Sequence, residues 1–342
     1  MIDLDLVVGD PSANTIVVTS PSIALNQISI TSDSPSYIPT PLNFTLTNGL
    51  LSATSVNIHD MVVQNAIVVT ATNSQVRFNA LTCSKVIQVR YLGQPIGGCV
   101  SVKSANGITE LTNSVFTNLK SNISIACFNT SAGGSLLVQN NTFTNCSFDV
   151  GELSSGALRV IGDGMDLKVL DTTFVNIQLG AVHLNTTNGS TLLFDGITVR
   201  DSQGAKYNLR LEATNRSNLV IQNVTMVNNT VISGSGIFLV HQNTDVTLSN
   251  CNFTSNYVVG VPNDPVMNCG AFRTAPPVVG EFNSTIIFEN SYVAYNNGSN
   301  GVGSTAAKIS GNSTYVMRNN TFIGNRGESA AGHYFNSNFS ST

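Results

Sequence analysis

The chain has 342 residues and a formal net charge of −4, and only 10% of its residues are charged, against roughly 25% in an average soluble protein. Lys and Arg are scattered, so the sequence lacks the basic patch that nucleic acid or an anionic membrane surface would need as a partner. No apolar run approaches the length of a membrane-spanning helix. No linker-like stretch divides the chain either, and we expect a single domain over residues 1–342.

Apolar and polar residues alternate with a period of two, which predicts strands, beginning with Leu4-DLVV and Thr15-IVV. Weaker copies of a repeated strand pattern begin at Ser55, Ser74 and Ile108. Seven clearer copies follow, in which alternating apolar residues precede a polar sixth residue and, three residues later, Phe, Val or Met. These copies occupy 135–145, 166–176, 191–201, 218–228, 245–255, 285–295 and 314–324.

A second short unit lies between the copies and consists of a small residue followed by alternation. It is found at 98–102, 156–160, 180–184, 236–240, 270–274 and 331–335. Each repeat therefore holds at least two strands and no helical pattern, and a unit of this size cannot bury its apolar face alone. The sequence predicts an all-β solenoid of roughly 12 coils, in which gaps of unequal length are protruding loops.

The apolar residues of the clear copies are expected to stack like on like as the core of the solenoid. This core comprises Leu136, Val138, Phe143, Val169, Phe174, Leu192, Phe194, Leu219, Ile221, Met226, Phe253, Ile286, Phe288, Tyr315, Met317 and Phe322.

The strings Phe116-TNL, Phe143-TNC, Phe174-VNI and Phe322-IGN, with Gly180-AV and Gly270-AF, resemble those of a known family. They are similar to right-handed parallel β-helices of the pectin-lyase-like type and, more narrowly, to polymorphic membrane protein repeats built from F-x-x-N and G-G-A-I. The resemblance covers roughly residues 50 to 335. It implies a right-handed parallel β-helix, a fold that carries lyases, hydrolases, adhesins and fibre proteins.

The sixth residue of the copies invites a further inference from this resemblance, because related β-helices stack Asn side chains in a turn. The residues are Asp60, Asn79, Asn113, Asn140, Asp171, Gly196, Asn223, Asn250, Asn290 and Asn319. We expect them to form an internal ladder. Since an inward Asn cannot carry a glycan, Asn140, Asn223 and Asn319 are ambiguous between ladder residues and glycosylation sites, and we favour the ladder.

Acceptor sequences for N-glycosylation, Asn-x-Ser/Thr, occur 16 times, more often than composition alone predicts. Besides the three ambiguous residues, the acceptors are Asn43, Asn122, Asn129, Asn145, Asn185, Asn188, Asn215, Asn228, Asn252, Asn283, Asn297, Asn312 and Asn338. We expect an extracellular glycoprotein. Residues 1–10 lack the features of a signal peptide, so a secreted form would have lost its signal or be a fragment.

Six of these acceptors fall just before the first strand of a repeat: Asn129, Asn185, Asn188, Asn215, Asn283 and Asn312. Equivalent loops of a solenoid stack on one another, with successive coils about 5 Å apart. We therefore expect a stripe of glycans that offsets the low surface charge.

Residues that could carry catalysis are sparse. The paired carboxylates of polysaccharide-cleaving β-helices are missing, as are G-H-G and R-I-K motifs, and the chain has no Trp to offer a sugar platform. Asp163 and Asp166 in Gly162-DGMD are interpreted as a turn, not a calcium site. His59, His183, His241 and His333 have no ligand-like spacing and are taken as surface residues. We expect no enzyme activity, no metal and no cofactor other than covalent glycans.

Six cysteines in a secreted chain predict three disulfides. A bridge requires Cα atoms within about 7 Å, so its partners must lie on the same or neighbouring coils. Cys251 and Cys269 are distant from the rest and are expected to pair. Two arrangements remain for the other four, and by analogy with the spacing of the isolated pair we prefer Cys83 with Cys99 and Cys127 with Cys146.

Together these observations favour a non-enzymatic extracellular structural protein, the subunit of a filament or surface appendage. No capping helix is evident at either end of the solenoid pattern, so we expect end-to-end stacking into a head-to-tail homopolymer. The alternatives are an adhesin or recognition rod whose loops bind a partner and, third, a polysaccharide lyase or glycoside hydrolase.

Overall fold

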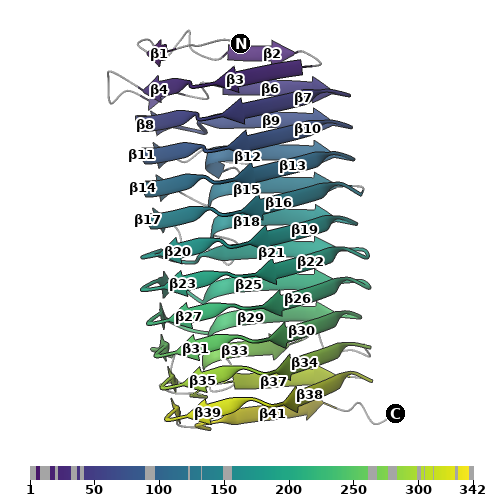
Figure 1. Cartoon of the computed structure of the whole chain (residues 1–342). Helices are drawn as coiled ribbons and strands as arrows, with labels where there is room; N and C mark the ends of the chain where they lie inside the picture. The colour runs from purple at the N-terminus through teal and green to yellow at the C-terminus, as the bar shows by residue number, and fades with distance from the viewer. Residues whose placement is uncertain are drawn as a thin grey trace. The chain divides into compact units, whose positions relative to one another are not determined.

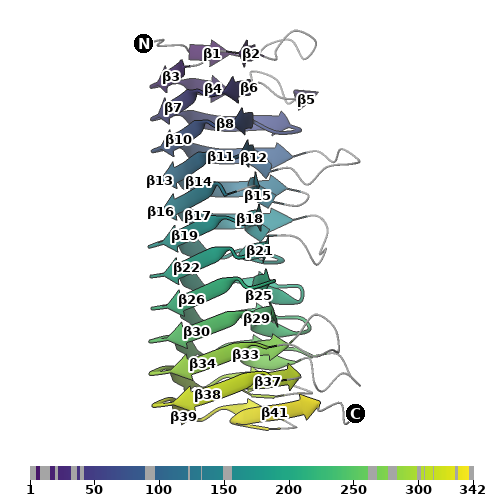
Figure 2. The ribbon, with the colours of Figure 1, turned by 90° about the vertical axis from the view of Figure 1, so that its right-hand side faces the viewer.

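The structure is a computed structural model that describes residues 5–7, 16–19, 22–31, 37–38, 42–88, 97–121, 124–131, 133–148, 156–260, 268–275, 283–298, 302–303, 305–310, 312–327 and 330–338. The chain divides into two compact units, Met1–Leu167 and Lys168–Thr342. Each unit is a stack of coils built from parallel strands, labelled in Figures 1 and 2. The expectation of one domain over 1–342 stays a prediction.

In the first unit every coil passes through three parallel sheets in the order B, C, A. Sheet B contains β2 (Ile16–Thr19), β6 (Leu42–Thr47), β9 (Ile67–Thr72), β12 (Gly97–Ala105), β15 (Ser124–Ser131) and β18 (Gly156–Asp163). Sheet C contains β3 (Ser22–Asn26), β7 (Leu50–Thr54), β10 (Gln75–Asn79), β13 (Ile108–Thr112) and β16 (Ser135–Gln139). Sheet A contains β1 (Asp5–Val7), β4 (Ser29–Thr31), β8 (Asn57–Val63), β11 (Thr82–Gln88), β14 (Val115–Ser121) and β17 (Thr142–Phe148), and β5 (Tyr37–Ile38) pairs with β8.

The second unit adds a fourth, short sheet D, so its coils run B, C, A, D. Strand β19 (Asp166–Leu170) lies where the units meet in sequence. Sheet B contains β21 (Val182–Thr187), β25 (Tyr207–Thr214), β29 (Ser235–Gln242), β33 (Cys269–Ala275), β37 (Thr305–Ser310) and β41 (His333–Asn338). Sheet C contains β22 (Thr191–Asp195), β26 (Asn218–Gln222), β30 (Asp245–Ser249), β34 (Thr285–Glu289) and β38 (Thr314–Arg318).

The two sheets that follow are made of very short strands. Sheet A contains β20 (Thr173–Val175), β23 (Thr198–Arg200), β27 (Thr225–Val227), β31 (Asn252–Thr254), β35 (Tyr292–Ala294) and β39 (Thr321–Ile323). Sheet D contains β24 (Gln203–Gly204), β28 (Thr230–Val231), β32 (Tyr257–Val258), β36 (Asn297–Gly298) and β40 (Arg326–Gly327).

The apolar residues of each strand point inward and stack in register along each unit. Phe116 and Phe143 are register partners on β14 and β17, and their rings stack with centroids 4.5 Å apart. Of the predicted core, all residues from Leu136 to Phe288 are buried. Tyr315, Met317 and Phe322 are only partly buried, because among the described residues no further strand of sheet C or sheet A follows β38 and β39 to cover them.

The register also corrects two of the weak repeat copies. Leu50, Gln75, Ile108 and Ser135 are partners in sheet C, so the first copy begins at Leu50 rather than Ser55, and the second at Gln75 rather than Ser74. Asp60 is therefore not equivalent to Asn113 and Asn140.

Candidate functional site

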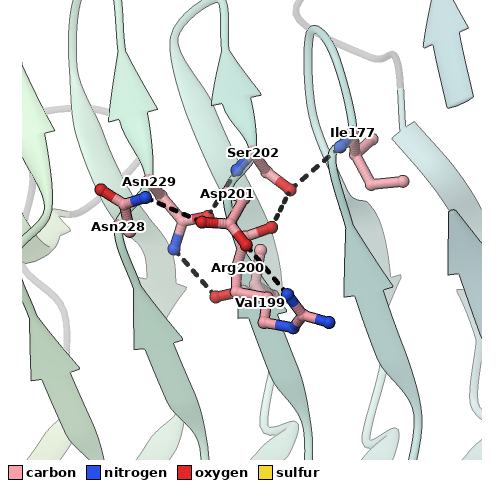
Figure 3. Close-up of polar contacts among 7 residues, drawn as sticks. All are labelled: Ile177, Val199, Arg200, Asp201, Ser202, Asn228 and Asn229. Carbon is pink, nitrogen blue, oxygen red and sulfur yellow. Dashed lines mark hydrogen bonds and ion pairs between the residues drawn. The ribbon is translucent and has the colours of Figure 1, made fainter. Parts of the chain in front are cut away.

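The turn that ends sheet A in the second unit carries an exposed polar ladder (Figure 3). Asn176, Asp201 and Asn228 adopt left-handed backbone conformations with φ between 51° and 56°, which Asn and Asp tolerate better than most residues. Asn228 Nδ2 donates to Asp201 Oδ1 at 2.7 Å, from one coil to the next. This hydrogen bond, together with the Arg200 guanidinium at 3.0 Å, holds the pKa of the Asp201 carboxyl below its usual value. The ladder lines an open groove of about 410 Å³.

A second, buried ladder runs one residue further along the chain. It consists of four asparagines in equivalent turns of successive coils: Asn229, Asn256, Asn296 and Asn325. The Nδ2 atom of each of the first three donates a hydrogen bond of 3.0 Å to the Oδ1 atom of the next. The same Oδ1 atoms accept backbone N–H groups, so the turn between sheets A and D is closed by side chains. Ser202 continues the column by accepting the backbone N–H of Ile177 (Figure 3).

The first unit has apolar residues at this point, namely Met61, Val86, Leu119 and Cys146, and its strands continue through it. In Phe116-TNL, Phe143-TNC and Phe174-VNI the Asn stands two residues after Phe and takes the exposed left-handed position. In Phe322-IGN it stands three residues after Phe and joins the buried ladder. The four strings are therefore not equivalent.

Sixth-position residues such as Asn113 and Asn140 form an external ladder, which corrects the predicted internal ladder, and Asn223 bonds to Asp195, the residue before the sixth-position Gly196. Asn140, Asn223 and Asn319 are exposed and have φ near 55°. Asn140 Nδ2 donates to Asn113 Oδ1 at 2.7 Å, and Asn223 Nδ2 donates to Asp195 Oδ1 at 2.7 Å. Because these side chains face outward, membership in the ladder does not exclude a glycan. Buried polar residues follow directly, such as Asn141, whose Oδ1 accepts the backbone N–H of Ser114.

Four of the six acceptors that were expected to form a glycan stripe lie in the same turn of their coils. Asn188, Asn215, Asn283 and Asn312 are exposed in the turn between sheets B and C of the second unit. Asn215 Nδ2 donates to Asn188 Oδ1 at 3.3 Å, and Asn243 Oδ1 accepts the backbone N–H of Asn283 at 3.0 Å. Asn129 and Asn185 were expected in the same turn. They lie instead within β15 and β21, where they are half-buried, because these strands continue further than the pattern suggested.

The other acceptors are spread over the two units. Asn145, Asn228 and Asn297 are exposed, Asn43 and Asn252 are half-buried on β6 and β31, and Asn338 ends β41. Asn122 lies outside the described residues. Exposure makes these sites sterically open, while their occupancy stays a prediction.

A disulfide joins Cys83 and Cys99, whose Cα atoms are 6.6 Å apart. A register shift between Gly97 and Val100 interrupts the alternation of β12 just where Cys99 meets Cys83. The pairs Cys127–Cys146 and Cys251–Cys269 are not formed, which corrects the predicted pairing.

The spacing of these four cysteines in the sequence did not reveal the direction in which their side chains point. Cys127 is in register with the charged Arg159, on the outer face of sheet B, whereas Cys146 is in the core of sheet A. The Cys251 thiol donates to the carbonyl of Ser249 at 3.3 Å, and Cys269 packs against Val302 and Ala306. All four thiols are buried, and burial raises the pKa of Cys251 to about 11.

Two of the histidines are not the surface residues that the sequence suggested, since His183 and His241 are 6% and 0% exposed. His59 is partly exposed, as predicted, and His333 is half-buried, which lowers its pKa to about 4. His241 alternates with the core residues Ile237 and Leu239 on β29 and therefore points inward.

The outer face of sheet B in the second unit carries a charged and aromatic cluster that the sequence did not reveal. His183, Arg210, Phe238 and Arg273 are partners in register on four successive strands. Arg210 pairs with Glu212, and Arg273 lies 5.1 Å from the centre of the Phe238 ring. The Phe238 ring stacks on Tyr207 at 4.6 Å. These residues are far apart in sequence, and only the common register of the coils brings them together.

Within the described ranges, no three His, Cys, Asp or Glu side chains are grouped as a metal site would require. Asp163 ends β18 and Asp166 begins β19, with Gly164 between them at positive φ, as expected for a turn. Nor does any helix in the described part of the chain have the length and apolar character to cross a membrane.

Residues 48–264 match the family model described as a right-handed β-helix region. No curated protein sequence shows a significant match to the chain. Among solved structures, an alginate lyase in complex with a trisaccharide is 9% identical, with a TM-score of 0.33 and coverage of 96% of this chain and 83% of the lyase.

Two further structures have comparable scores. The catalytic unit of an α-1,3-glucanase from Streptomyces thermodiastaticus is 10% identical, with a TM-score of 0.29, 92% of this chain covered and 65% of the glucanase. The A-module of a mannuronan C-5 epimerase from Azotobacter vinelandii is 8% identical, with a TM-score of 0.26 and coverage of 96% and 92%. Likeness at this level carries no argument about activity.

Proposed function

The chain belongs to the family of right-handed β-helix proteins, and we propose that it is a non-enzymatic, heavily N-glycosylated structural protein of the extracellular space. The observation that carries this proposal is that the exposed acceptors Asn188, Asn215, Asn283 and Asn312 share one turn of the coils, with the non-acceptor Asn243 on the coil between Asn215 and Asn283. Coils about 4.8 Å apart would crowd the attached sugars into a hydrated sheath. Such a sheath would keep the protein soluble, because a surface with only 10% charged residues in the chain contributes little to solubility.

Site-resolved glycopeptide mapping tests this proposal on the full chain secreted from eukaryotic cells. We expect high occupancy at these four sites and precipitation of the folded protein after enzymatic removal of the glycans. A matched variant with Gln at the four positions should lose solubility without losing its strand content by circular dichroism. Four empty sites in a secreted, folded and soluble protein would contradict the proposal.

The finer part of the proposal is growth by end-to-end stacking into a head-to-tail homopolymer. Its support is the coil made of β38 and β39, where Tyr315, Met317 and Phe322 remain partly exposed. Their partners one coil earlier, Ile286, Phe288 and Val293, are fully buried. A coil contributed by a second copy would bury this apolar edge and pair its open strands. Electron microscopy of the secreted glycoprotein tests the idea, and strictly monomeric particles at high concentration would contradict it.

We also propose that the repeats are of the type found in polymorphic membrane proteins, which is supported by Phe322-IGN and by Gly270-AF on β33.

Recognition of a partner is the second candidate function, favoured by the cluster of His183, Arg210 and Arg273 with its stacked aromatic rings. Arg210, whose guanidinium lies over the Tyr207 ring, is partly exposed, whereas Arg273 and His183 are 5% and 6% exposed, so Arg210 is the group available to an acidic saccharide. The test compares retention of the Arg210→Gln variant on immobilised acidic polysaccharide with that of the Arg77→Gln control in the first unit, and equal retention would contradict recognition by this cluster.

A further inference from the structure

Three tyrosines are exposed on two successive coils of the second unit. Tyr257, Tyr292 and Tyr295 are 39%, 38% and 58% exposed, and they lie on or beside the short strands of sheets A and D. Large aromatic rings in water are unfavourable, and a group of them on one surface marks a place where something binds. The chain has eight tyrosines, so three of them in a segment of 39 residues is a marked concentration.

Two of these tyrosines stand directly beside glycan acceptors on the neighbouring coil. Asn252 on β31 is the register partner of Tyr292 on β35, and Tyr257 on β32 is the register partner of Asn297 on β36. The arrangement is crosswise, because each of the two coils supplies one acceptor and one ring. In the sequence, five positions separate Asn252 from Tyr257 and five separate Tyr292 from Asn297.

All four side chains belong to the outer face. Their chain neighbours Phe253, Val258, Val293 and Gly298 are buried, and side chains alternate along a strand. Adjacent strands are about 4.8 Å apart, so the ring of each tyrosine begins within one sugar diameter of the neighbouring acceptor.

The local contacts leave room for this association. Thr254 Oγ1 donates to Asn252 Oδ1 at 2.5 Å, which engages the oxygen of the amide and not Nδ2, the atom to which a glycan is attached. Tyr295 lies in the turn between the two columns, and its ring covers Gly324 of the next coil, where a Cβ atom would come within 2.7 Å of it. Tyr257, Tyr292 and Tyr295 therefore all lie on the surface of these two coils.

We propose that Tyr292 and Tyr257 are platforms for the first sugars of the glycans on Asn252 and Asn297, respectively. The inference rests on the proposed function, because it requires these sites to be glycosylated. A pyranose ring has a face of C–H groups that packs on a flat aromatic ring, and tyrosine supplies such a face at a low cost in side-chain entropy. The glycan covers the exposed ring, and the ring fixes the direction in which the glycan leaves the protein.

Asn223 and Asn228 serve as internal controls in the same unit. Their Nδ2 atoms donate to the carboxylates Asp195 and Asp201 at 2.7 Å, and Asn250 and Ser255 are the equivalent residues on the next coil. No tyrosine stands beside them in register among the described residues. Glycans at these two sites are expected to move independently of any tyrosine.

The test follows the enzymatic release of glycans from the folded, secreted full chain by a peptide N-glycosidase, site by site, with mass spectrometry. Replacing Tyr257 by Ala should accelerate release at Asn297 by roughly fivefold, the factor for an aromatic contact of about 1 kcal/mol, and leave Asn252 unchanged. Tyr292→Ala should do the reverse. The Phe variants retain the ring and should behave as the wild type, and release at Asn223 and Asn228 should not change in any variant.

Each outcome decides the inference. The crosswise pattern supports it. Equal release rates in wild type and Ala variants, at occupied sites, overturn it while the proposed function stands. If Asn252 and Asn297 carry no glycan while other sites do, the platform inference fails and the proposed function stands. If no site carries a glycan, the proposed function fails as well. A loss of self-association in the Ala variants without a change in release rates would assign the tyrosines to contacts between copies and reject the platform.

Discussion

Replacing Asn256 by Ala should destabilise the second unit far more than any exposed Asn substitution in the same turn. The Asn256 side chain takes part in four hydrogen bonds: it donates to Met226 O at 2.9 Å and to Asn296 Oδ1 at 3.0 Å, and it accepts from the backbone N–H and the Nδ2 of Asn229 at 3.1 and 3.0 Å. Asn256 is 3% exposed, so water does not replace these partners.

The magnitude follows from counting the groups left without partners. Each hydrogen bond contributes about 1 kcal/mol net, and a buried backbone group that loses its partner costs about 1–3 kcal/mol. We therefore expect a loss of about 4–6 kcal/mol. The matched control is Asn228→Ala, which removes one hydrogen bond between exposed groups, Asn228 Nδ2 to Asp201 Oδ1, and places Ala at a φ of 56°. It should cost about 1–2 kcal/mol, clearly less than Asn256→Ala.

Urea denaturation of both variants measures the difference, and hydrogen exchange at the Asn229 backbone N–H locates it. Stacked repeats can unfold in parts, so the exchange rate of this single amide is the more direct readout. It should rise in Asn256→Ala and stay unchanged in Asn228→Ala. Equal stability losses in the two variants, or a protected Asn229 amide in Asn256→Ala, would refute the reasoning that the buried ladder holds this turn.

Phe143→Ala removes a fully buried ring that stacks on Phe116, and a loss of about 3–5 kcal/mol is expected in thermal or urea unfolding; a loss below 1 kcal/mol would contradict the stacked core. The disulfide closes a segment of 16 residues, so a Cys83→Ala, Cys99→Ala double variant should lose about 3 kcal/mol, and an unchanged urea midpoint would argue against the bridge. The folded pKa of His333, about 4, lies below its unperturbed value of 6.5, so its contribution to stability is complete above pH 6.5 and falls as the pH drops toward 4. His333→Gln should flatten the stability profile between those pH values, and an identical slope in the variant would sink this assignment.

The fold class could be predicted from the sequence because the strand signal is local. Residues 135–145 and 218–228 show the alternation, the polar turn residue and the aromatic or aliphatic anchor within eleven positions, and burial followed that alternation at Leu136, Val138 and Phe143. A period of two fixes which side chains point inward, and units too small to fold alone must stack.

The exposed acceptors of the turn between sheets B and C were predictable for the same reason. Asn188 and Asn215 follow a strand and precede a strand, and a solenoid places equivalent turns above one another. The external position of Asn140 and Asn223 was not predictable from the sequence. Asn in a turn is compatible both with an outward side chain on a left-handed backbone and with an inward hydrogen-bonded ladder. Asn228 and Asn229 are consecutive residues of the same type, yet the first is exposed and the second is buried.

Contacts between coils were decided by the tertiary structure alone. The distance in sequence between His183 and Arg273, or between Asn252 and Tyr292, says nothing about their proximity, because the loops between coils vary in length. The same holds for Cys127 and Cys146, whose spacing suggested a bridge although their side chains point to different faces. Sequence therefore determines what each coil is made of, while the register between coils determines which side chains meet, because parallel pairing joins residues by coil position and not by separation along the chain.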